Sequence, residues 1–124
     1  MRLPEEDEEY LNAKGHRWEL IPDPSGALLV IRAFPVNPAI YDCATCDLMV
    51  RIPAQYNIAA LDMFYAAPPI RLKSGAFPIQ ADQMEAFSGQ QWQRFSRHLE
   101  HWRAGVDTIR AMLSFAEREL KGQQ

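Results

Sequence analysis

The chain has 124 residues, of which 48% are hydrophobic and 23% are charged. This length suffices for one globular domain with a core of its own and leaves no room for a second. The 13 Lys and Arg against 16 Asp and Glu give a formal net charge of -3, which argues against a protein that binds nucleic acid by neutralising many phosphates. We therefore expect a single domain over residues 1–124 and no nucleic-acid partner.

The sequence shows no segment typical of membrane insertion or export. The longest strictly apolar run, residues 27–31, is far too short to span a bilayer. The first residues are acidic, whereas a signal peptide begins with a basic and then an apolar segment. The chain has two cysteines, Cys43 and Cys46, too few for a disulfide framework. These features predict a cytoplasmic protein with no membrane partner.

The front of the chain is typical of a helix followed by strands. Residues 5–9 are all acidic, which suits either the first turn of a short helix or a frayed, solvated end. All nine prolines lie within residues 1–78, where they favour turns and strand edges. Short runs rich in strand-forming residues predict four strands, at residues 16–21, 27–34, 47–52 and 63–72. With a tight reversal at residues 22–26, they predict an antiparallel meander.

The proline-free rear of the chain is typical of helices. Ser88 and Gln91 form a capping-box pattern and Phe87 and Trp92 a hydrophobic staple, so we expect a helix to begin near Gly89. One apolar stripe at helical spacing follows it and a second lies nearer the C-terminus. Their members are Trp92, Phe95, Leu99 and Trp102, and then Val106, Ile109, Leu113, Ala116 and Leu120.

The order of these features resembles the ubiquitin-conjugating enzyme (E2/UBC) superfamily. Residues 62–64, 92–98 and 102–107 further resemble a bacterial branch of it, the prokaryotic E-type ubiquitin-conjugating-like proteins. Phe95 stands where that branch would have tryptophan, and Ala104 where it would have proline. The resemblance covers nearly the whole chain. It implies an α+β fold in which a four-stranded antiparallel meander packs against helices from the C-terminal half.

The expected nucleophile of that superfamily is absent. Its well-studied members carry a cysteine in the loop after the fourth strand, but this chain has no cysteine after Cys46. The resemblance leads us to expect Ser96 as the acyl acceptor, with His98 or His101 as its base. Residues two apart on a helix point about 200° away from each other. A helix here would therefore separate Ser96 from His98, whereas an extended segment would let them meet.

Cationic and aromatic side chains nearby are candidates for partner binding. On the helical interpretation, several cations share a face whose only nearby carboxylate is Glu100, and this patch would suit an acidic partner or a C-terminal tail. A solvated helix face is the alternative. Phe64 and Tyr65 would be docking residues if exposed, or would simply fill the last strand. The cations are Arg94, Arg97, His98 and His101, with Arg103 as a further candidate.

The two cysteines allow three interpretations. Cys43 and Cys46 with His98 and His101 contain the ligand types of a zinc site, but the histidine spacing is one residue short of the usual range. A redox pair would normally open a helix, and here a strand follows. Two small buried hydrophobic residues are the favoured interpretation, so we expect no metal and no cofactor.

The function implied by the resemblance is a carrier step in a bacterial ubiquitin-like conjugation pathway. The chain would accept the C-terminus of a ubiquitin-like protein from an adenylating activating enzyme, as an oxyester, and pass it to an amine or similar target. The alternative, favoured by the missing cysteine, is a non-catalytic variant that binds the ubiquitin-like protein or its activating enzyme without a covalent bond.

Overall fold

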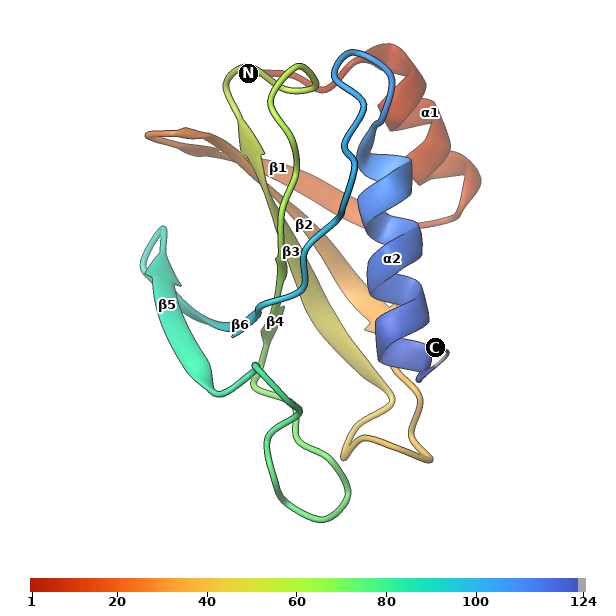
Figure 1. Ribbon diagram of the computed structural model, residues 1–124, viewed down its shortest axis with the longest axis vertical. Helices are drawn as coiled ribbons and strands as arrows, with labels where there is room; N and C mark the ends of the chain where they lie inside the picture. Colours follow the sequence, from red (N-terminus) through yellow and green to blue (C-terminus); the bar gives the residue numbers. More distant parts are fainter. Residues whose placement is uncertain (123–124) are drawn as a thin grey trace.

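The computed structural model describes residues 1–122, which form an α+β domain with one antiparallel sheet (Figure 1). The sheet has six strands in the order β1-β2-β3-β4-β6-β5. None of the helices in this part of the chain is long and apolar enough to cross a bilayer. The elements in chain order are α1 (Glu5–Ala13), β1 (Arg17–Asp23), β2 (Gly26–Pro35), β3 (Thr45–Pro53), β4 (Phe64–Ala67), β5 (Gln83–Phe87), β6 (Gln90–Phe95) and α2 (Ile109–Lys121).

The first four strands lie where the sequence predicts them, in antiparallel order. The reversal between β1 and β2 needs Gly26, which has a φ of 146° and would place a Cβ against the carbonyl of Ile52. Strand β4 is shorter than predicted and ends at Ala67, because Pro68 and Pro69 supply no N–H groups for a ladder. A meander of four strands is thus only part of the sheet.

The helix predicted near Gly89 is wrong, and a hairpin of β5 and β6 stands in its place. Phe87 pairs with Gln90, so the turn between them consists of Ser88 and Gly89, with φ values of 50° and 77°. Two successive positive φ values are the signature of a type I′ turn, the tightest hairpin connection. The hairpin extends the meander through pairing of β6 with β4.

The closing helix is confirmed over most of its predicted length. It begins at Ile109 rather than Val106, which precedes it and is 60% exposed. Thr108 caps its N-terminus by accepting a hydrogen bond from the N–H of Arg110 at 3.3 Å. The rest of the predicted stripe is buried, namely Ile109, Leu113, Ala116 and Leu120.

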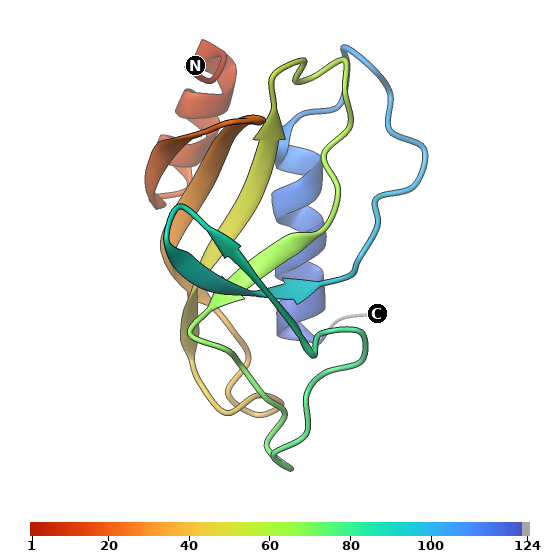
Figure 2. The same cartoon turned by 90° about the vertical axis from the view of Figure 1, so that its left-hand side faces the viewer.

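The sheet has two differently covered faces. Both helices lie on one side of it, which we call the helix face, and the β5–β6 hairpin crosses over the other, which we call the hairpin face (Figures 1 and 2). The main core lies under the helices and includes Leu29, Leu48, Phe64, Phe95 and Leu113. A smaller core on the hairpin face consists of Leu28, Val30, Met49, Tyr65, Ala67 and Trp92, with Ile21 and Phe87 packed against it.

Candidate functional site

Ser96 follows directly after β6, in a segment with no regular structure through residue 100. Its N–H donates to the carbonyl of Gln80 at 3.0 Å, and the carbonyl of Arg97 accepts from the N–H of Met63 at 3.0 Å. These bonds tie the segment to the loop after β4 on one side and to the residue before β4 on the other. Ser96 itself is half-buried.

His98 is held by a carboxylate that the sequence analysis did not identify. Its Nδ1 lies 2.8 Å from Oδ1 of Asp62, and the two side chains are 62% and 50% exposed. An ionised carboxylate only accepts hydrogen bonds, so Nδ1 donates and Nε2 is left to accept a proton. His101, 93% exposed and 3.9 Å from Glu100, has no comparable orientation. Of the two predicted bases, His98 is therefore the one in a defined orientation.

The expected helical separation of Ser96 from His98 does not occur, because the segment is not a helix. Within residues 1–122, however, the Ser96 hydroxyl makes no hydrogen bond to either His98 or His101. Such bonds are often long in the free form of an enzyme and tighten only when substrate binds. The two groups are thus close in sequence and unobstructed by helical geometry, but they are not assembled as a dyad.

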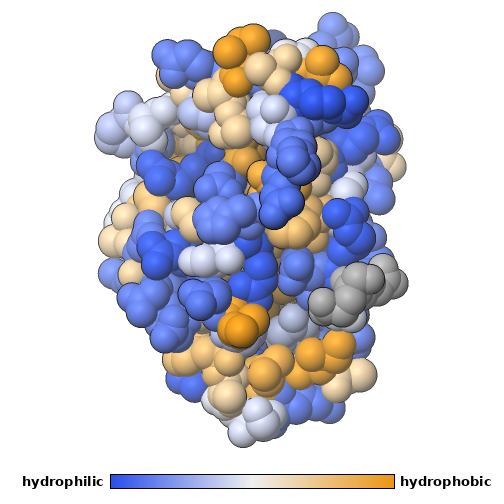
Figure 3. Space-filling model, viewed as in Figure 1, coloured by the Kyte–Doolittle hydropathy of each residue, from blue (hydrophilic) through white to orange (hydrophobic). Residues whose placement is uncertain are grey.

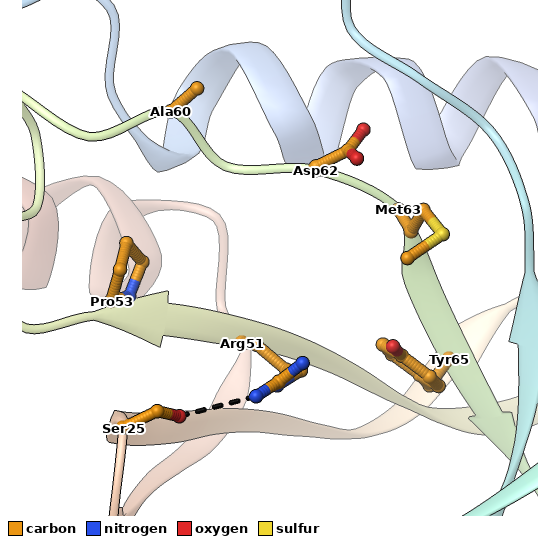
Figure 4. A pocket seen from close by; sticks show the side chains of 7 residues that line it. All are labelled: Ser25, Arg51, Pro53, Ala60, Asp62, Met63 and Tyr65. Carbon is orange, nitrogen blue, oxygen red and sulfur yellow. Dashed lines mark hydrogen bonds between the residues drawn. The ribbon is translucent and has the colours of Figure 1, made fainter.

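A pocket of about 280 Å³ opens beside Asp62 (Figure 4). Arg51 lies in it between Ser25 and Tyr65, and its Nη2 donates to the Ser25 hydroxyl at 3.2 Å. Asp62, which lines the pocket, also binds the candidate base His98. The lining residues are Ser25, Arg51, Pro53, Ala60, Asp62, Met63 and Tyr65.

The predicted cationic patch is wrong. Arg94 points to the hairpin face with Trp92, whereas Arg97 points to α2, because the segment begins as a strand whose side chains alternate. Glu100 is not the only carboxylate nearby, since each of the three candidate arginines has an acidic partner from elsewhere in the chain. The pairs are Arg94 with Glu85 (2.6 Å), Arg97 with Glu119 (3.2 Å) and Arg103 with Asp107 (2.7 Å).

Phe64 and Tyr65 are not exposed docking residues. Phe64 is 0% exposed and stacks on Phe95 with ring centroids 4.9 Å apart, and Tyr65 is 1% exposed on the opposite face of the sheet. The alternative interpretation, that they fill the last strand of the meander, describes them correctly. Large apolar side chains are exposed in the loops instead, at Ile58, Ile79 and Val106, and also at Met1 and at Met84 in β5. Figure 3 likewise shows apolar side chains near both ends of a mainly polar surface.

The two cysteines behave as thiols. Both are free, and Cys46 is buried in β3 while Cys43 is half-buried. Burial raises the pKa of Cys46 to about 12 and also raises the pKa of Cys43, which disfavours the thiolate needed for nucleophilic or redox chemistry. Within residues 1–122, no group of three or more His, Cys, Asp or Glu side chains is arranged to hold a metal ion.

The sequence model of the prokaryotic E2 family E matches residues 3–123, almost the whole chain. No curated protein and no solved structure matches. The six-stranded sheet with two helices is compatible with an E2-like fold, and the match connects the chain with the conjugation of ubiquitin-like proteins.

Proposed function

Because the chain belongs to the prokaryotic E2 family E, we propose that it performs the carrier step in conjugation of a ubiquitin-like protein. It accepts the C-terminal acyl group of that protein from an adenylating activating enzyme and passes it to an amine or similar acceptor. The observation that carries the proposal is the oriented His98–Asp62 pair two residues beyond a half-buried Ser96, in a chain with no cysteine after Cys46.

The chemistry we propose is an oxyester transfer. The hydroxyl oxygen of Ser96 attacks the activated carbonyl carbon, the bond to the activating enzyme's leaving group breaks, and the hydroxyl proton passes to Nε2 of His98. A serine hydroxyl is a weak nucleophile at neutral pH, so a base in fixed orientation matters more than it does for a thiol. Asp62 acts through His98 by holding its proton on Nδ1, which makes Asp62 a positioning residue.

Protein partners are supported by the exposed loops at one end of the domain. Ile58 is 68% exposed and Val106 is 60% exposed. Their loops are joined by a hydrogen bond from the N–H of Gly105 to the carbonyl of Asn57 at 3.1 Å. Apolar side chains presented on linked loops suit contact with another protein. These two residues replace Phe64 and Tyr65 as candidates for docking the ubiquitin-like protein or its activating enzyme.

The experiment is a reconstitution with the activating enzyme, ATP and the ubiquitin-like protein, followed by intact mass spectrometry. We expect an adduct that resists thiols and is cleaved by base, because it is an ester. Ser96→Ala abolishes it, and Asp62→Asn slows its formation by about 100-fold. Ser74→Ala, a change at an exposed loop serine, leaves the rate unchanged. An adduct that persists in Ser96→Ala excludes Ser96 as the acceptor.

The second candidate function is a non-catalytic binding module. It is favoured by the absence of a hydrogen bond between the Ser96 hydroxyl and either histidine within residues 1–122. In the same reconstitution, this function predicts a stable complex with the ubiquitin-like protein or the activating enzyme but no covalent adduct. Ile58→Ala and Val106→Ala would then weaken the complex while Ser96→Ala would not.

A further inference from the structure

Arg51 is a half-buried cation without a direct anionic partner among the described residues. It lies on the hairpin face of β3 and lines the pocket of about 280 Å³ beside Asp62. Among residues 1–122 it forms no ion pair, and its one side-chain hydrogen bond in this part of the chain is from Nη2 to the hydroxyl of Ser25. Ser25 in turn donates to Asp23 at 2.6 Å, so the nearest carboxylate in this network reaches Arg51 only through a hydroxyl.

Two other arginines on the same face provide a direct comparison. Arg32 pairs with Asp47 at 2.9 Å and also with Glu19, and Arg94 pairs with Glu85 at 2.6 Å. Their side chains are 36% and 33% exposed, so they too are partly removed from water. A partly buried charge without a counter-charge is unfavourable. Arg51 thus differs from its neighbours in lacking the acidic side chain that each of them has.

The surroundings of Arg51 hold it in place, although no carboxylate of residues 1–122 forms an ion pair with it. Its guanidinium carbon lies 4.9 Å from the centre of the Phe87 ring, a stacking arrangement that restricts the side chain and leaves nitrogen atoms at the edge of the guanidinium plane. Figure 4 shows Tyr65 beside Arg51, on the side away from Ser25. A cation fixed in this way loses little further side-chain entropy when it binds a ligand.

We propose that this pocket binds a carboxylate that carries a short apolar body. The carboxylate oxygens accept hydrogen bonds from the Nη atoms of Arg51, and the apolar part packs against Met63 and Pro53. A doubly charged anion such as phosphate is disfavoured, because Asp62 lines the same pocket and Asp23 binds the same serine. The carboxylate is supplied either by a small acid or by an acidic side chain of a protein.

The test is a titration of the full chain, followed by NMR signals of the arginine side chains and the methionine methyl groups. The probes are butyrate, N-acetylglutamate amide with a free side-chain carboxylate, and inorganic phosphate. We expect saturable shifts at Arg51 and Met63 with at least one carboxylate, at millimolar concentration, and weaker binding of phosphate. Binding of butyrate but not of the glutamate derivative indicates that the ligand is a small acid. Binding of the glutamate derivative indicates an acidic side chain of a protein. Absence of shifts with both carboxylates, or tighter binding of phosphate, overturns the proposal.

Substitutions show whether Arg51 is the residue that binds the carboxylate. Arg51→Gln weakens carboxylate binding about tenfold, equivalent to about 1.4 kcal/mol, and Arg51→Lys, which keeps the charge but loses the planar fork, weakens it less. The matched control is Arg110→Gln, because Arg110 also stacks on a ring, that of Tyr10 at 4.6 Å, but lies away from this pocket. Equal binding by all three variants overturns the proposal. No activating enzyme is present, so the result does not depend on whether the chain is a carrier.

Discussion

The two faces of the sheet differ in what they bury. The helix face carries the larger core and is closed by α1 and α2. The hairpin face carries a smaller core and, around it, charged side chains and the pocket of about 280 Å³. Strand β6 contributes to both, since Phe95 belongs to the first core and Trp92 to the second. One face is thus closed over the larger core, while the other leaves a pocket beside a smaller core.

The largest expected effect comes from removing one aromatic ring of β6 from each of the two cores. Phe95→Ala and Trp92→Ala each remove a ring that is at most 2% exposed and should lower the free energy of unfolding by about 3 to 5 kcal/mol. Amide hydrogen exchange distinguishes them. Phe95→Ala should accelerate exchange in α2, and Trp92→Ala in β5. If Trp92→Ala accelerates α2 as much as Phe95→Ala does, the two faces are not independent.

Gln93, between those two residues, is a buried polar group on the helix face. Its side chain is 0% exposed and accepts from the N–H of Ile70 at 2.7 Å. It also donates to the carbonyls of Ile70 and Ala81 at 2.9 and 2.8 Å. One amide thereby closes the loop between residues 70 and 81, whose end also holds the N–H of Ser96 through Gln80.

Gln93→Leu should therefore destabilise the protein by about 2 to 4 kcal/mol, because it leaves three buried backbone groups without partners. Hydrogen exchange in residues 70–81 should accelerate more than exchange in β2 and β3. Gln91→Leu, an exposed position on the same strand, is the control and should change stability by no more than about 0.5 kcal/mol. Equal effects of the two substitutions would contradict the role given to Gln93.

The sequence predicts the parts of the fold whose pattern is local. Alternation in β3 and helical spacing in α2 are properties of neighbouring residues, and both elements form as expected. The β5–β6 hairpin was missed because Ser88 and Gln91 also satisfy a helix-capping pattern. The spacing of Trp92 and Phe95 suits a helical stripe, although in β6 it places the two rings on opposite faces. Here the pairing of β6 with β4 decides the outcome.

The candidate site was only half predictable for the same reason. The family resemblance of the chain points to Ser96 and His98. No local pattern links His98 to Asp62, which lies 36 residues away. Their contact depends on the pairing of Phe64 with Phe95, which aligns the segments on either side of them. The acidic partners of Arg94 and Arg97 likewise come from β5 and α2, so charge counts within one segment gave the wrong patch.

Asp7, a buried residue of α1, should make the stability of the protein depend on pH. It is 2% exposed and accepts a hydrogen bond from the Tyr56 hydroxyl at 2.7 Å, and that hydroxyl accepts from the N–H of Ile109 at 2.7 Å. Burial raises the pKa of Asp7 above its ordinary 3.8, although the bond from Tyr56 acts in the opposite direction. The folded state therefore binds the carboxyl proton of Asp7 more tightly than the unfolded state does. The free energy of unfolding falls as pH rises from the pKa of the unfolded state through that of the folded state.

Asp7→Asn should remove this dependence while keeping an acceptor for Tyr56. The unfolding free energy of the unmodified chain minus that of the variant should fall as pH rises from below 3.8 through the raised pKa, and then stay level. Urea denaturation at several pH values measures it. Glu5→Gln, an exposed change on the same helix, should show no such trend. A difference that grows with pH would have the wrong sign.

The smallest expected effect concerns the turn of the hairpin. Ser88 adopts a φ of 50° and precedes Gly89, a position at which asparagine is the favoured residue of a type I′ turn. Ser88→Asn should therefore stabilise the protein by about 0.5 kcal/mol, measured by urea denaturation, with slower hydrogen exchange in β5 and β6 and no change in α2. Ser74→Asn, in another exposed loop but without a positive φ, should have no such effect. If Ser88→Asn destabilises the chain and Ser74→Asn does not, the segment does not form a type I′ turn.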